Sequence, residues 1–349
     1  MKKIIYHSLK QYCTIALHFY FSRWQVDERS PIPSGPVIFV PNHQNAFLDA
    51  ILISCSGNRN PWFLTRSTVF NEFTKKILAT LQMSPVYRFR DGFGTLRKND
   101  EVIENCVKLL SQQKSILIFG EGNHNNQWFL RPLQKGFARI AIAAEEKNNW
   151  KLGVKIVPVG VQYESHNDFR ARVLITFGNP ILVNDYYQAG LGPQENVDIL
   201  LKKTSEGMKE LILHIDPEQY ESKLNYWRSH RELKNDLVEQ LLADQNLVAH
   251  IPPADFVPAS KDAQRSPWWN PIRIYEYINH FLPRSILRLI LKNKIKDPQF
   301  IGSIKFVAGM VLVPVFYIIQ TGLCYAISQS WPITLTYFIS LPISILLRR

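Results

Sequence analysis

The sequence predicts an α/β fold in which a mixed, largely parallel sheet is flanked by helices. An N-terminal amphipathic helix is expected before it and a C-terminal helical membrane hairpin after it. Three observations lead to this prediction. Short apolar runs alternate with helical stretches between residues 36 and 177. Apolar residues recur at helical spacing in residues 1–24, and residues 306–347 contain no Asp, Glu, Lys or Arg.

Strands are expected where short apolar runs end at turn residues or before a helix, at 36–40, 60–65, 84–89, 115–119, 154–162 and 172–177. Helices are expected between them, up to about residue 55 and at about 69–81, 98–113 and 134–146. This alternation is typical of a parallel sheet. Residues 25–215 would form this domain, and residues 216–300 a helical extension. We expect the α/β core to be complete near residue 215.

The N-terminal segment, residues 1–24, predicts a helix whose apolar face carries Ile5, Leu9, Tyr12, Ala16 and Phe19. Such a helix suits a membrane interface. A helix that covers the core of the globular domain fits the same pattern. No small-residue cleavage site follows, so a secretory signal peptide is not expected.

The C-terminal segment, residues 301–349, is expected to form a transmembrane or re-entrant hairpin. Its uncharged run can hold two short helices, because one spanning helix needs about 20 apolar residues. Residues 328–332 suit the turn between them. Basic residues on both flanks place both ends on the cytoplasmic side; they are Arg284, Arg288, Lys292, Lys294, Lys296, Lys305, Arg348 and Arg349. The alternative is a buried helical hairpin of a soluble domain.

Composition limits the classes of function. A hydrophobic content of 46% with 20% charged residues excludes a disordered or fibrous chain. The net charge of +12 indicates an anionic partner, for which nucleic acid, a phospholipid surface and a phosphorylated metabolite are all open. The four scattered cysteines match neither metal-binding spacing nor a disulfide framework, which favours a reducing, cytosolic setting.

Reactive side chains follow the first expected strand, and in α/β sheets ligands bind where strands end and helices begin. His43 comes shortly after residues 36–40, and Asp49 lies six positions later. A continuous helix would put the two on different faces, so they can meet only if His43 lies in the loop before the helix. A carboxylate on one imidazole nitrogen leaves the other free to take a proton from a hydroxyl. A His near an Asp is more often structural.

Two further strand ends carry groups suited to ligand binding. In Gly120-Glu121-Gly122 the glycines allow close backbone approach to a ligand, although this pattern alone is usually a turn. Arg88 and Arg90 alternate with apolar residues and so share one face of a strand. They suit either a phosphate clamp or a solvated sheet edge.

Together and in this order, these segments resemble the glycerophosphate acyltransferase superfamily, which includes the lysophosphatidic acid acyltransferases. The matching segments are Asn42-His43…Asp49, Val86-Tyr87-Arg88, Phe119-Gly120-Glu121-Gly122 and Ile156-Val157-Pro158-Val159, within about residues 20–215.

Two features depart from the family pattern. Five residues, not four, separate His43 from Asp49, a spacing associated with some glycerol-3-phosphate or dihydroxyacetone-phosphate branches. Asn123-His124 stands where Thr-Arg is common, so the role of that Arg would fall to Arg131 or Lys135 or be absent.

The resemblance implies acyl transfer without a covalent intermediate. His43, oriented by Asp49, would take the proton of the acceptor hydroxyl, whose oxygen would attack the carbonyl of the donor. The acceptor site would be formed by Arg88 and Arg90 on its phosphate, Glu121 and Gly122 around it, and Pro158 in its wall. No cofactor or metal would be required. Acyl-CoA, acyl carrier protein or acyl phosphate would be the co-substrate.

The sequence therefore predicts a membrane-bound O-acyltransferase of phospholipid synthesis whose active site faces the cytoplasm. Lysophosphatidic acid (1-acyl-sn-glycerol 3-phosphate) is the favoured acceptor, with glycerol 3-phosphate or dihydroxyacetone phosphate as alternatives. A noncatalytic membrane scaffold is an alternative from another class. No nucleic-acid partner is expected, because the densest basic cluster adjoins the apolar run and is not interleaved with stacking aromatics on a soluble face.

Overall fold

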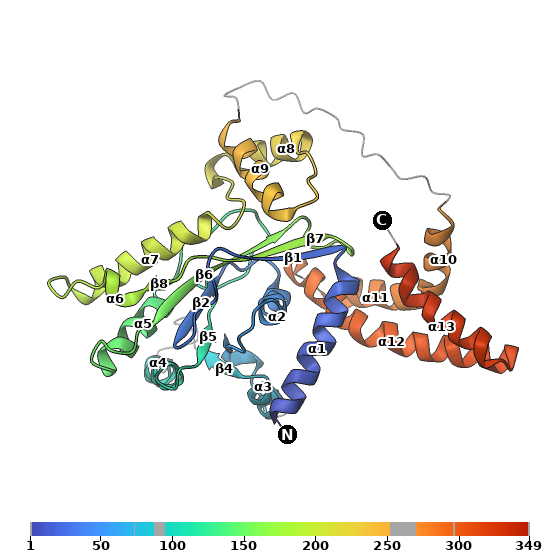
Figure 1. Cartoon of the computed structure of the whole chain (residues 1–349), viewed down its shortest axis with the longest axis horizontal. Coiled ribbons are helices and arrows are strands. Elements are labelled where there is room, and N and C mark those ends of the chain that lie inside the picture. Colours follow the sequence, from blue (N-terminus) through green and yellow to red (C-terminus); the bar gives the residue numbers. More distant parts are fainter. Residues whose placement is uncertain (1, 73, 87–94, 252–269, 296, 348–349) are drawn as a thin grey trace.

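The structure is a computed structural model that describes residues 2–72, 74–86, 95–251, 270–295 and 297–347 (Figure 1). The strands are β1 (Arg23–Glu28), β2 (Val37–Pro41), β3 (Trp62–Arg66), β4 (Met83–Val86), β5 (Ser115–Leu117), β6 (Lys155–Tyr163), β7 (Arg172–Phe177) and β8 (Ile181–Leu182). The helices are α1 (Lys2–Tyr20), α2 (Ala46–Ser56), α3 (Thr74–Thr80), α4 (Thr95–Ser111), α5 (Gly136–Lys147), α6 (Val183–Tyr186), α7 (Pro193–Lys209), α8 (Tyr220–His230), α9 (Leu237–Ala249), α10 (Pro271–Asn279), α11 (Phe281–Lys294), α12 (Ile301–Ser328) and α13 (Trp331–Leu346).

The strands form one sheet in the order β1-β7-β6-β2-β5-β3-β4, with β8 beside β6. Strands β2, β3, β4 and β5 pair in parallel, β2 is also parallel to β6, and β1 is parallel to β7. Strand β6 is antiparallel to β7 and β8. The prediction of a mixed, largely parallel sheet is confirmed. The sequence analysis missed β1 and β8.

The central strand β2 fixes where the functional loops lie. All five of its residues are buried, and it pairs with β5 on one side and β6 on the other. Because β2 and β5 run in parallel, their carboxyl ends meet at the same edge of the sheet. The loop that follows β2 contains His43, and the loop that follows β5 contains Glu121.

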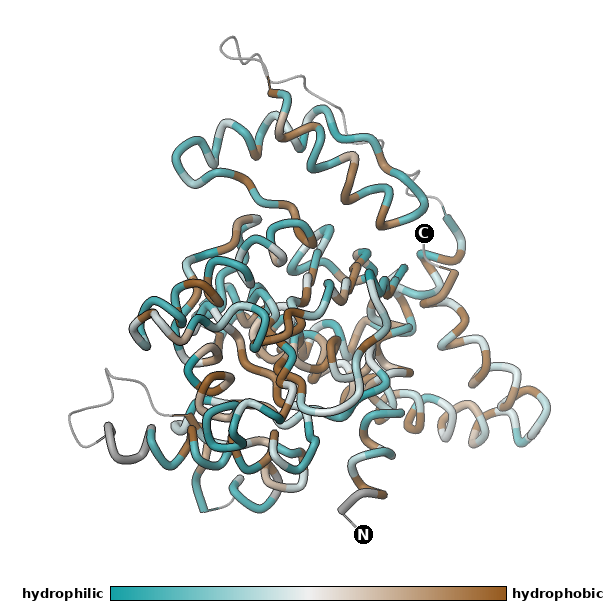
Figure 2. Tube along the Cα trace, turned by 60° about the vertical axis from the view of Figure 1, so that its left-hand side comes forward, coloured by the Kyte–Doolittle hydropathy of each residue, from teal (hydrophilic) through white to brown (hydrophobic). Residues whose placement is uncertain are grey.

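Helices cover both faces of the sheet (Figure 1), and an apolar layer lies beneath them on each face. Ile38 and Val40 of β2 point to the layer beneath α4, α5 and α7. Val37 and Phe39 point to the opposite layer, beneath α1 and α2. This alternation follows from the two-residue period of a strand. Figure 2 shows hydrophobic stretches at the centre of the molecule, and others along the helices near the C-terminus.

The expectation that the core is complete near residue 215 is wrong. Phe306 of α12 is 1% exposed and belongs to the same apolar cluster as Leu17 of α1 and Leu48 of α2. The start of the C-terminal helix therefore closes one face of the α/β core. The sequence analysis missed this because Phe306 opens the uncharged run and was assigned to the membrane.

Helix α1 combines the two alternatives considered for the N-terminal segment. Leu17 is fully buried and Tyr20 is 6% exposed, so one side covers the core. Ile4 is 70% exposed and Ile15 is 56% exposed, so another side presents apolar surface. Helix α1 also contacts α12, to which the Tyr12 hydroxyl donates a hydrogen bond at the Met310 carbonyl.

The segment 216–300 divides into two parts that lie in different places (Figure 1). Helices α8 and α9 pack on the sheet through a third apolar cluster that includes Trp128, Leu174 and Trp227. Helices α10 and α11 pack instead against α13 and α12. The expected turn of the hairpin is confirmed, since Gln329 caps α12 in a left-handed conformation with φ 49° and α13 begins at Trp331.

Candidate active site

The His43 imidazole and the Asp49 carboxylate meet as the sequence analysis required. His43 lies in the loop before α2, and Asp49 lies in the first turn of that helix. Nδ1 of His43 is 2.9 Å from Oδ2 of Asp49. With its proton on Nδ1, the imidazole donates to the carboxylate and leaves Nε2 as an acceptor. Fourteen per cent of the His43 side chain is exposed, which leaves it open to a substrate.

The Asp49 carboxylate is fully buried and held from three further directions. Oδ2 also accepts hydrogen bonds from the backbone N–H groups of Gln44 and Asn45, each at 2.8 Å. Oδ1 accepts a hydrogen bond of 2.7 Å from the hydroxyl of Tyr163, at the end of β6. Burial raises the pKa of Tyr163, so this hydroxyl stays protonated and remains a donor. These contacts fix the carboxylate that orients His43.

Two aromatic rings contact the His43 imidazole away from Asp49. Phe119 stacks on His43 with ring centroids 3.8 Å apart and planes 16° apart. His124 approaches edge-on at 5.4 Å. Burial, followed by the proximity of His43, lowers the pKa of His124, so His124 is neutral near pH 7.

Glu121 supports the backbone of the histidine loop. Its Oε1 accepts a hydrogen bond of 3.1 Å from the His43 N–H, and its Oε2 accepts one of 2.7 Å from Nε of Arg131. Burial raises the pKa of Glu121, and the Arg131 guanidinium opposes that shift. Arg131 also donates to the Asn123 carbonyl. Lys135, the other residue considered for this role, points to Asp198 of α7 at 3.5 Å.

The glycines around Glu121 form a tight turn. Gly122 has a φ of +74°, a conformation that residues with a side chain rarely adopt, and its N–H donates to the Phe119 carbonyl at 3.1 Å. A Cβ on Gly120 would lie 3.0 Å from the Val40 side chain and 3.1 Å from the Leu133 side chain, so a side chain here would have to push these two aside by a few tenths of an ångström. The turn brings the Glu121 side chain beneath His43.

Pro158 is not part of this cluster. Pro158 is buried in β6, where its ring faces Gly207 of α7; a Cβ on Gly207 would lie 3.2 Å from it. This contact is on the α7 face of the sheet, and its role in an acceptor-site wall stays a prediction. Arg88 and Arg90 lie outside the described residues.

Sequence analysis missed several residues that hold the site. The Asn42 side chain accepts from the Val161 N–H at 2.7 Å and donates to the Val161 carbonyl at 3.0 Å, which ties the loop to β6. Asn42 stood in the recognised motif but had no assigned role. Tyr163, a tyrosine at the end of a buried strand, carried no such signal.

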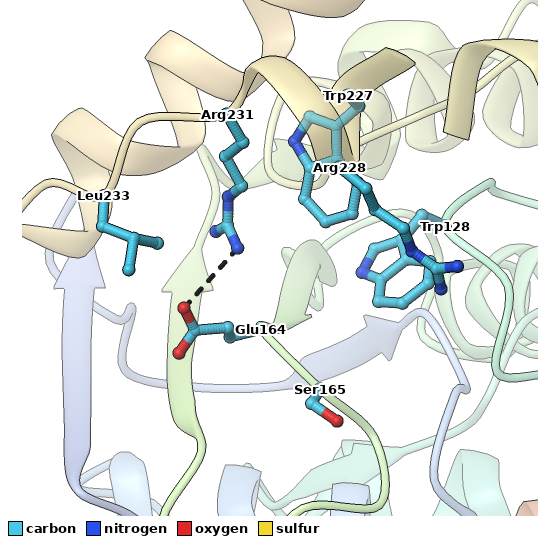
Figure 3. A pocket seen from close by; sticks show the side chains of 7 residues that line it. All are labelled: Trp128, Glu164, Ser165, Trp227, Arg228, Arg231 and Leu233. Atoms are coloured by element: carbon cyan, nitrogen blue, oxygen red, sulfur yellow. Dashed lines mark ion pairs between the residues drawn. The ribbon is translucent and has the colours of Figure 1, made fainter. Parts of the chain in front are cut away.

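A surface groove lies beside α8, and His43, Asp49 and Glu121 are not among its lining residues. It has a volume of about 420 Å³ and is lined by Trp128, Glu164, Ser165, Trp227, Arg228, Arg231 and Leu233 (Figure 3). The Arg228 guanidinium lies 5.5 Å above the Trp128 ring, and Arg231 pairs with Glu164 at 3.6 Å.

A second hollow of about 400 Å³ shares Trp128, Ser165 and Arg228 with this groove and reaches Gln127 and His166. Both of these contact Gln44, which donates to the Gln127 carbonyl at 2.9 Å and lies 3.2 Å from His166. The second hollow is therefore linked to the histidine loop through Gln44.

The segment that contains His43, Asp49 and Glu121 matches a known protein family. The family model described as Acyltransferase matches residues 23–162. Glycerol-3-phosphate O-acyltransferase 2 of Saccharomyces cerevisiae is 30% identical over 144 residues, which cover 41% of this chain and 19% of the yeast protein. Glycerol-3-phosphate O-acyltransferase 1 of the same yeast is 34% identical over 126 residues, 32% of this chain and 16% of that protein. The chain thus spans less than a fifth of the length of these relatives.

Among solved structures, the 1-acyl-sn-glycerophosphate (LPA) acyltransferase PlsC from Thermotoga maritima aligns with a TM-score of 0.43 and 17% identity. The alignment covers 60% of this chain and 80% of that protein. Residues 23–162 are therefore identified as an acyltransferase domain of the glycerophosphate acyltransferase superfamily.

Proposed function

We propose that this protein is an O-acyltransferase that moves a fatty acyl chain to a hydroxyl of a glycerophosphate acceptor. The observation that carries the proposal is the pair of His43 and Asp49, 2.9 Å apart, with one imidazole nitrogen held by the carboxylate and the other left as an acceptor. A neutral imidazole in this state is a general base for a hydroxyl. The superfamily to which this domain belongs supports the same reaction class.

In the proposed mechanism, Nε2 of His43 takes the proton of the acceptor hydroxyl as its oxygen attacks the acyl carbonyl of the donor. The carbonyl carbon becomes tetrahedral, its bond to the leaving thiolate or phosphate then breaks, and His43 returns the proton to that group. The imidazolium formed between these steps is stabilised by the Asp49 carboxylate. Glu121 holds the backbone of the same loop through the His43 N–H.

Glycerol 3-phosphate is the acceptor that the sequence relatives favour. Two yeast relatives named as glycerol-3-phosphate O-acyltransferases match at 30% identity over 144 residues and 34% identity over 126 residues. The spacing of five residues between His43 and Asp49 agrees with that branch of the resemblance. Lysophosphatidic acid, the acceptor first favoured from the sequence, is the second candidate. Arg88 and Arg90 remain the proposed ligands of the acceptor phosphate.

We also propose that α12 and α13 insert into a phospholipid membrane, with the active site on the cytoplasmic side. Residues 298–328 form a helical stretch of 31 residues. Its most apolar window has a mean hydropathy of 1.9, and only 22% of that window is buried inside the protein. Exposed apolar side chains continue on α10 and α11, where Ile278 is 66% exposed and Leu289 is 58% exposed. Burial of an acyl chain contributes about 0.8 kcal/mol per methylene, so an enzyme at the bilayer meets its donor and product there.

The reaction is tested with the purified full-length protein in liposomes. Three acceptors (glycerol 3-phosphate, dihydroxyacetone phosphate and 1-acyl-glycerol 3-phosphate) are each combined with acyl-CoA, acyl carrier protein and acyl phosphate donors. His43→Ala should lower the rate by about 10²- to 10⁴-fold, because the general base is lost. His250→Ala, which removes an exposed histidine at the end of α9, is the matched control. Wild-type rates in His43→Ala would overturn the assignment, and no transfer in any combination would favour a noncatalytic scaffold.

The membrane proposal is tested by a carbonate wash of membranes that carry the full-length chain. Protein held by apolar burial should stay in the pellet, whereas protein held by charge alone is released. Complete release would favour the alternative in which the uncharged run is a helical hairpin of a soluble domain.

A further inference from the structure

The first turns of α12 lie directly on the loop that carries His43. Gly302 and Ser303 are buried, and Ser303 is 0% exposed. The Tyr20 hydroxyl of α1 donates to the Gly302 carbonyl at 3.2 Å, which helps to hold this end of α12 in place. The start of the proposed membrane hairpin and the proposed catalytic loop are therefore in direct contact.

Ser303 bridges the end of the histidine loop, at Asn45, and the first turn of α2, at Leu48. Its hydroxyl donates to the Asn45 carbonyl at 2.6 Å and accepts from the Leu48 N–H at 3.0 Å. Between these two residues lies Ala46, whose φ of 43° is uncommon for a residue with a side chain and persists only where the surroundings hold it. The Asn45 N–H also donates a hydrogen bond to the Asp49 carboxylate, across the same turn between loop and helix.

Gly302 permits this close approach because it has no side chain. A Cβ at this position would lie 2.4 Å from the His166 carbonyl and 2.6 Å from Nδ2 of Asn45. The Asn45 amide donates to that carbonyl at 2.8 Å, so a side chain on Gly302 would collide with a hydrogen bond of the loop. Helix α12 and the loop fit only with glycine here.

Other contacts seat the same end of α12 on the neighbouring loops. Lys305 donates to the Asn167 carbonyl at 2.6 Å. Before the helix, Asp297 lies 3.9 Å from His124, and the Phe300 ring lies 4.7 Å from the His124 ring. His124 in turn borders His43. The contact between α12 and the site therefore extends over three loops.

We propose that Ser303 is a positioning residue for the pair of His43 and Asp49, so that acyl transfer requires α12 to be seated on the histidine loop. The inference rests on the proposed function, because it names what sets the geometry of that reaction. Ser303 touches no reacting atom. It fixes the backbone from Asn45 to Leu48, and that backbone sets the direction in which Asp49 holds the imidazole.

Ser303→Ala removes the bridge, and Ser344→Ala is its matched control. Ser344 is also a buried serine of the C-terminal helices, at 4% exposure, but its hydroxyl bonds within α13 to the Leu341 carbonyl at 2.7 Å. We expect Ser303→Ala to lower kcat by about 10- to 100-fold, since a misplacement of about 1 Å costs about 10²-fold. The KM for the acceptor should stay within about twofold, because Ser303 does not bind the acceptor. Ser344→Ala should keep wild-type kcat.

A second pair of variants tests the seating of the helix by volume instead of by hydrogen bonding. Gly302→Ala pushes α12 away from Asn45, whereas Gly309→Ala adds the same methyl group to α12 where no atom lies within 4 Å. We expect loss of kcat in the first variant and none in the second. The melting temperature of each variant confirms that the protein in the assay is folded.

Hydrogen exchange of the peptide containing residues 44–49 measures the loop without any reaction. Its exchange should rise in Ser303→Ala and Gly302→Ala, and stay at the wild-type level in the two controls. A folded Ser303→Ala variant with wild-type kcat and exchange would overturn the inference. Equal losses in the controls would also overturn it, because they would mean that any disturbance of the hairpin has the same effect. If the wild-type protein transfers no acyl group, the proposed function fails, and the exchange experiment alone decides whether Ser303 positions the loop.

Discussion

The ring of Phe119 lies flat on the imidazole of His43, with centroids 3.8 Å apart, while Asp49 holds the imidazole at its edge. The two contacts restrict different motions: the carboxylate sets the direction of Nδ1, and the phenyl ring sets the plane. Phe119 is the first residue of the Phe-Gly-Glu-Gly segment, so that segment supplies both a stacking partner and the Glu121 carboxylate.

Phe119→Ala should lower kcat by about tenfold, because the imidazole plane is then free to rotate away from the attacking geometry. Phe119→Tyr keeps the ring and should keep most of the activity. Steady-state rates of both variants provide the measurement. Wild-type kcat in Phe119→Ala would show that Asp49 alone orients the base.

Asp49→Asn should lower kcat by about 10²- to 10⁴-fold while the fold is retained, because the amide keeps the shape but not the charge that stabilises the imidazolium. Tyr163→Phe is the comparison, since it removes the hydrogen bond to Oδ1 and leaves the carboxylate. Its loss should be about tenfold or less. Similar losses in both variants would assign the effect to packing and not to charge.

Arg131→Ala should destabilise the protein by about 3 kcal/mol at pH 7, because it leaves the buried Glu121 carboxylate without its cation. Burial already raises the pKa of Glu121, and removal of Arg131 raises it further. A raised pKa favours the protonated form, so the deficit is largest above the folded-state pKa and fades toward the unfolded value of about 4.3. Melting temperatures of the variant and wild type should therefore converge as the pH falls from 7 to 5. A constant difference over this range would mean that Glu121 does not titrate there.

Arg88→Ala should raise the KM for a phosphorylated acceptor far more than the KM for the acyl donor, because it removes a charge-assisted contact to phosphate. The KM values for acceptor and donor are measured with the pair of substrates that reacts in the assay of all acceptor and donor combinations. Equal changes in both would assign Arg88 to the donor site or to the fold.

Deletion of residues 301–349 should abolish cooperative unfolding, because it removes Phe306 from the core and Ser303 from the histidine loop. Replacement of Phe306 by alanine alone should cost about 3–5 kcal/mol. Deletion of residues 329–349, which keeps both residues, is the control. Thermal melts and limited proteolysis distinguish the two truncated proteins, and a stable, soluble product of the longer deletion would contradict the shared core.

The sequence predicted the pairing of His43 with Asp49 because both lie in one short segment, where a buried strand, a loop and a helix follow one another. Local rules of this kind fix the direction of a side chain within a few residues. Strand β1 was missed for the opposite reason: it is a polar sheet edge, and its partner β7 lies 149 residues away, as the register from Arg23 to Arg172 shows. No local pattern identifies such a partner.

The supports of the site were likewise hidden in long-range contacts. Asn42 bonds to Val161 across 119 residues, and Tyr163 reaches Asp49 across 114. The prediction for the C-terminal segment rested on its hydropathy alone. Hydropathy indicates whether a helix suits a lipid environment, but it does not indicate that the first turns of α12 pack on the core. Composition cannot separate these two uses of one helix.

The bridge from Ser303 to Leu48 spans 255 residues of chain, and this separation has a consequence for biosynthesis. At about 5–20 residues per second, a ribosome completes His43 and Asp49 roughly 13 to 51 seconds before it adds Ser303. During that interval the histidine loop and one face of the core lack the residues that cover them. The nascent domain therefore exposes apolar surface until α12 emerges, and the histidine loop reaches its final geometry only after Ser303 has been added.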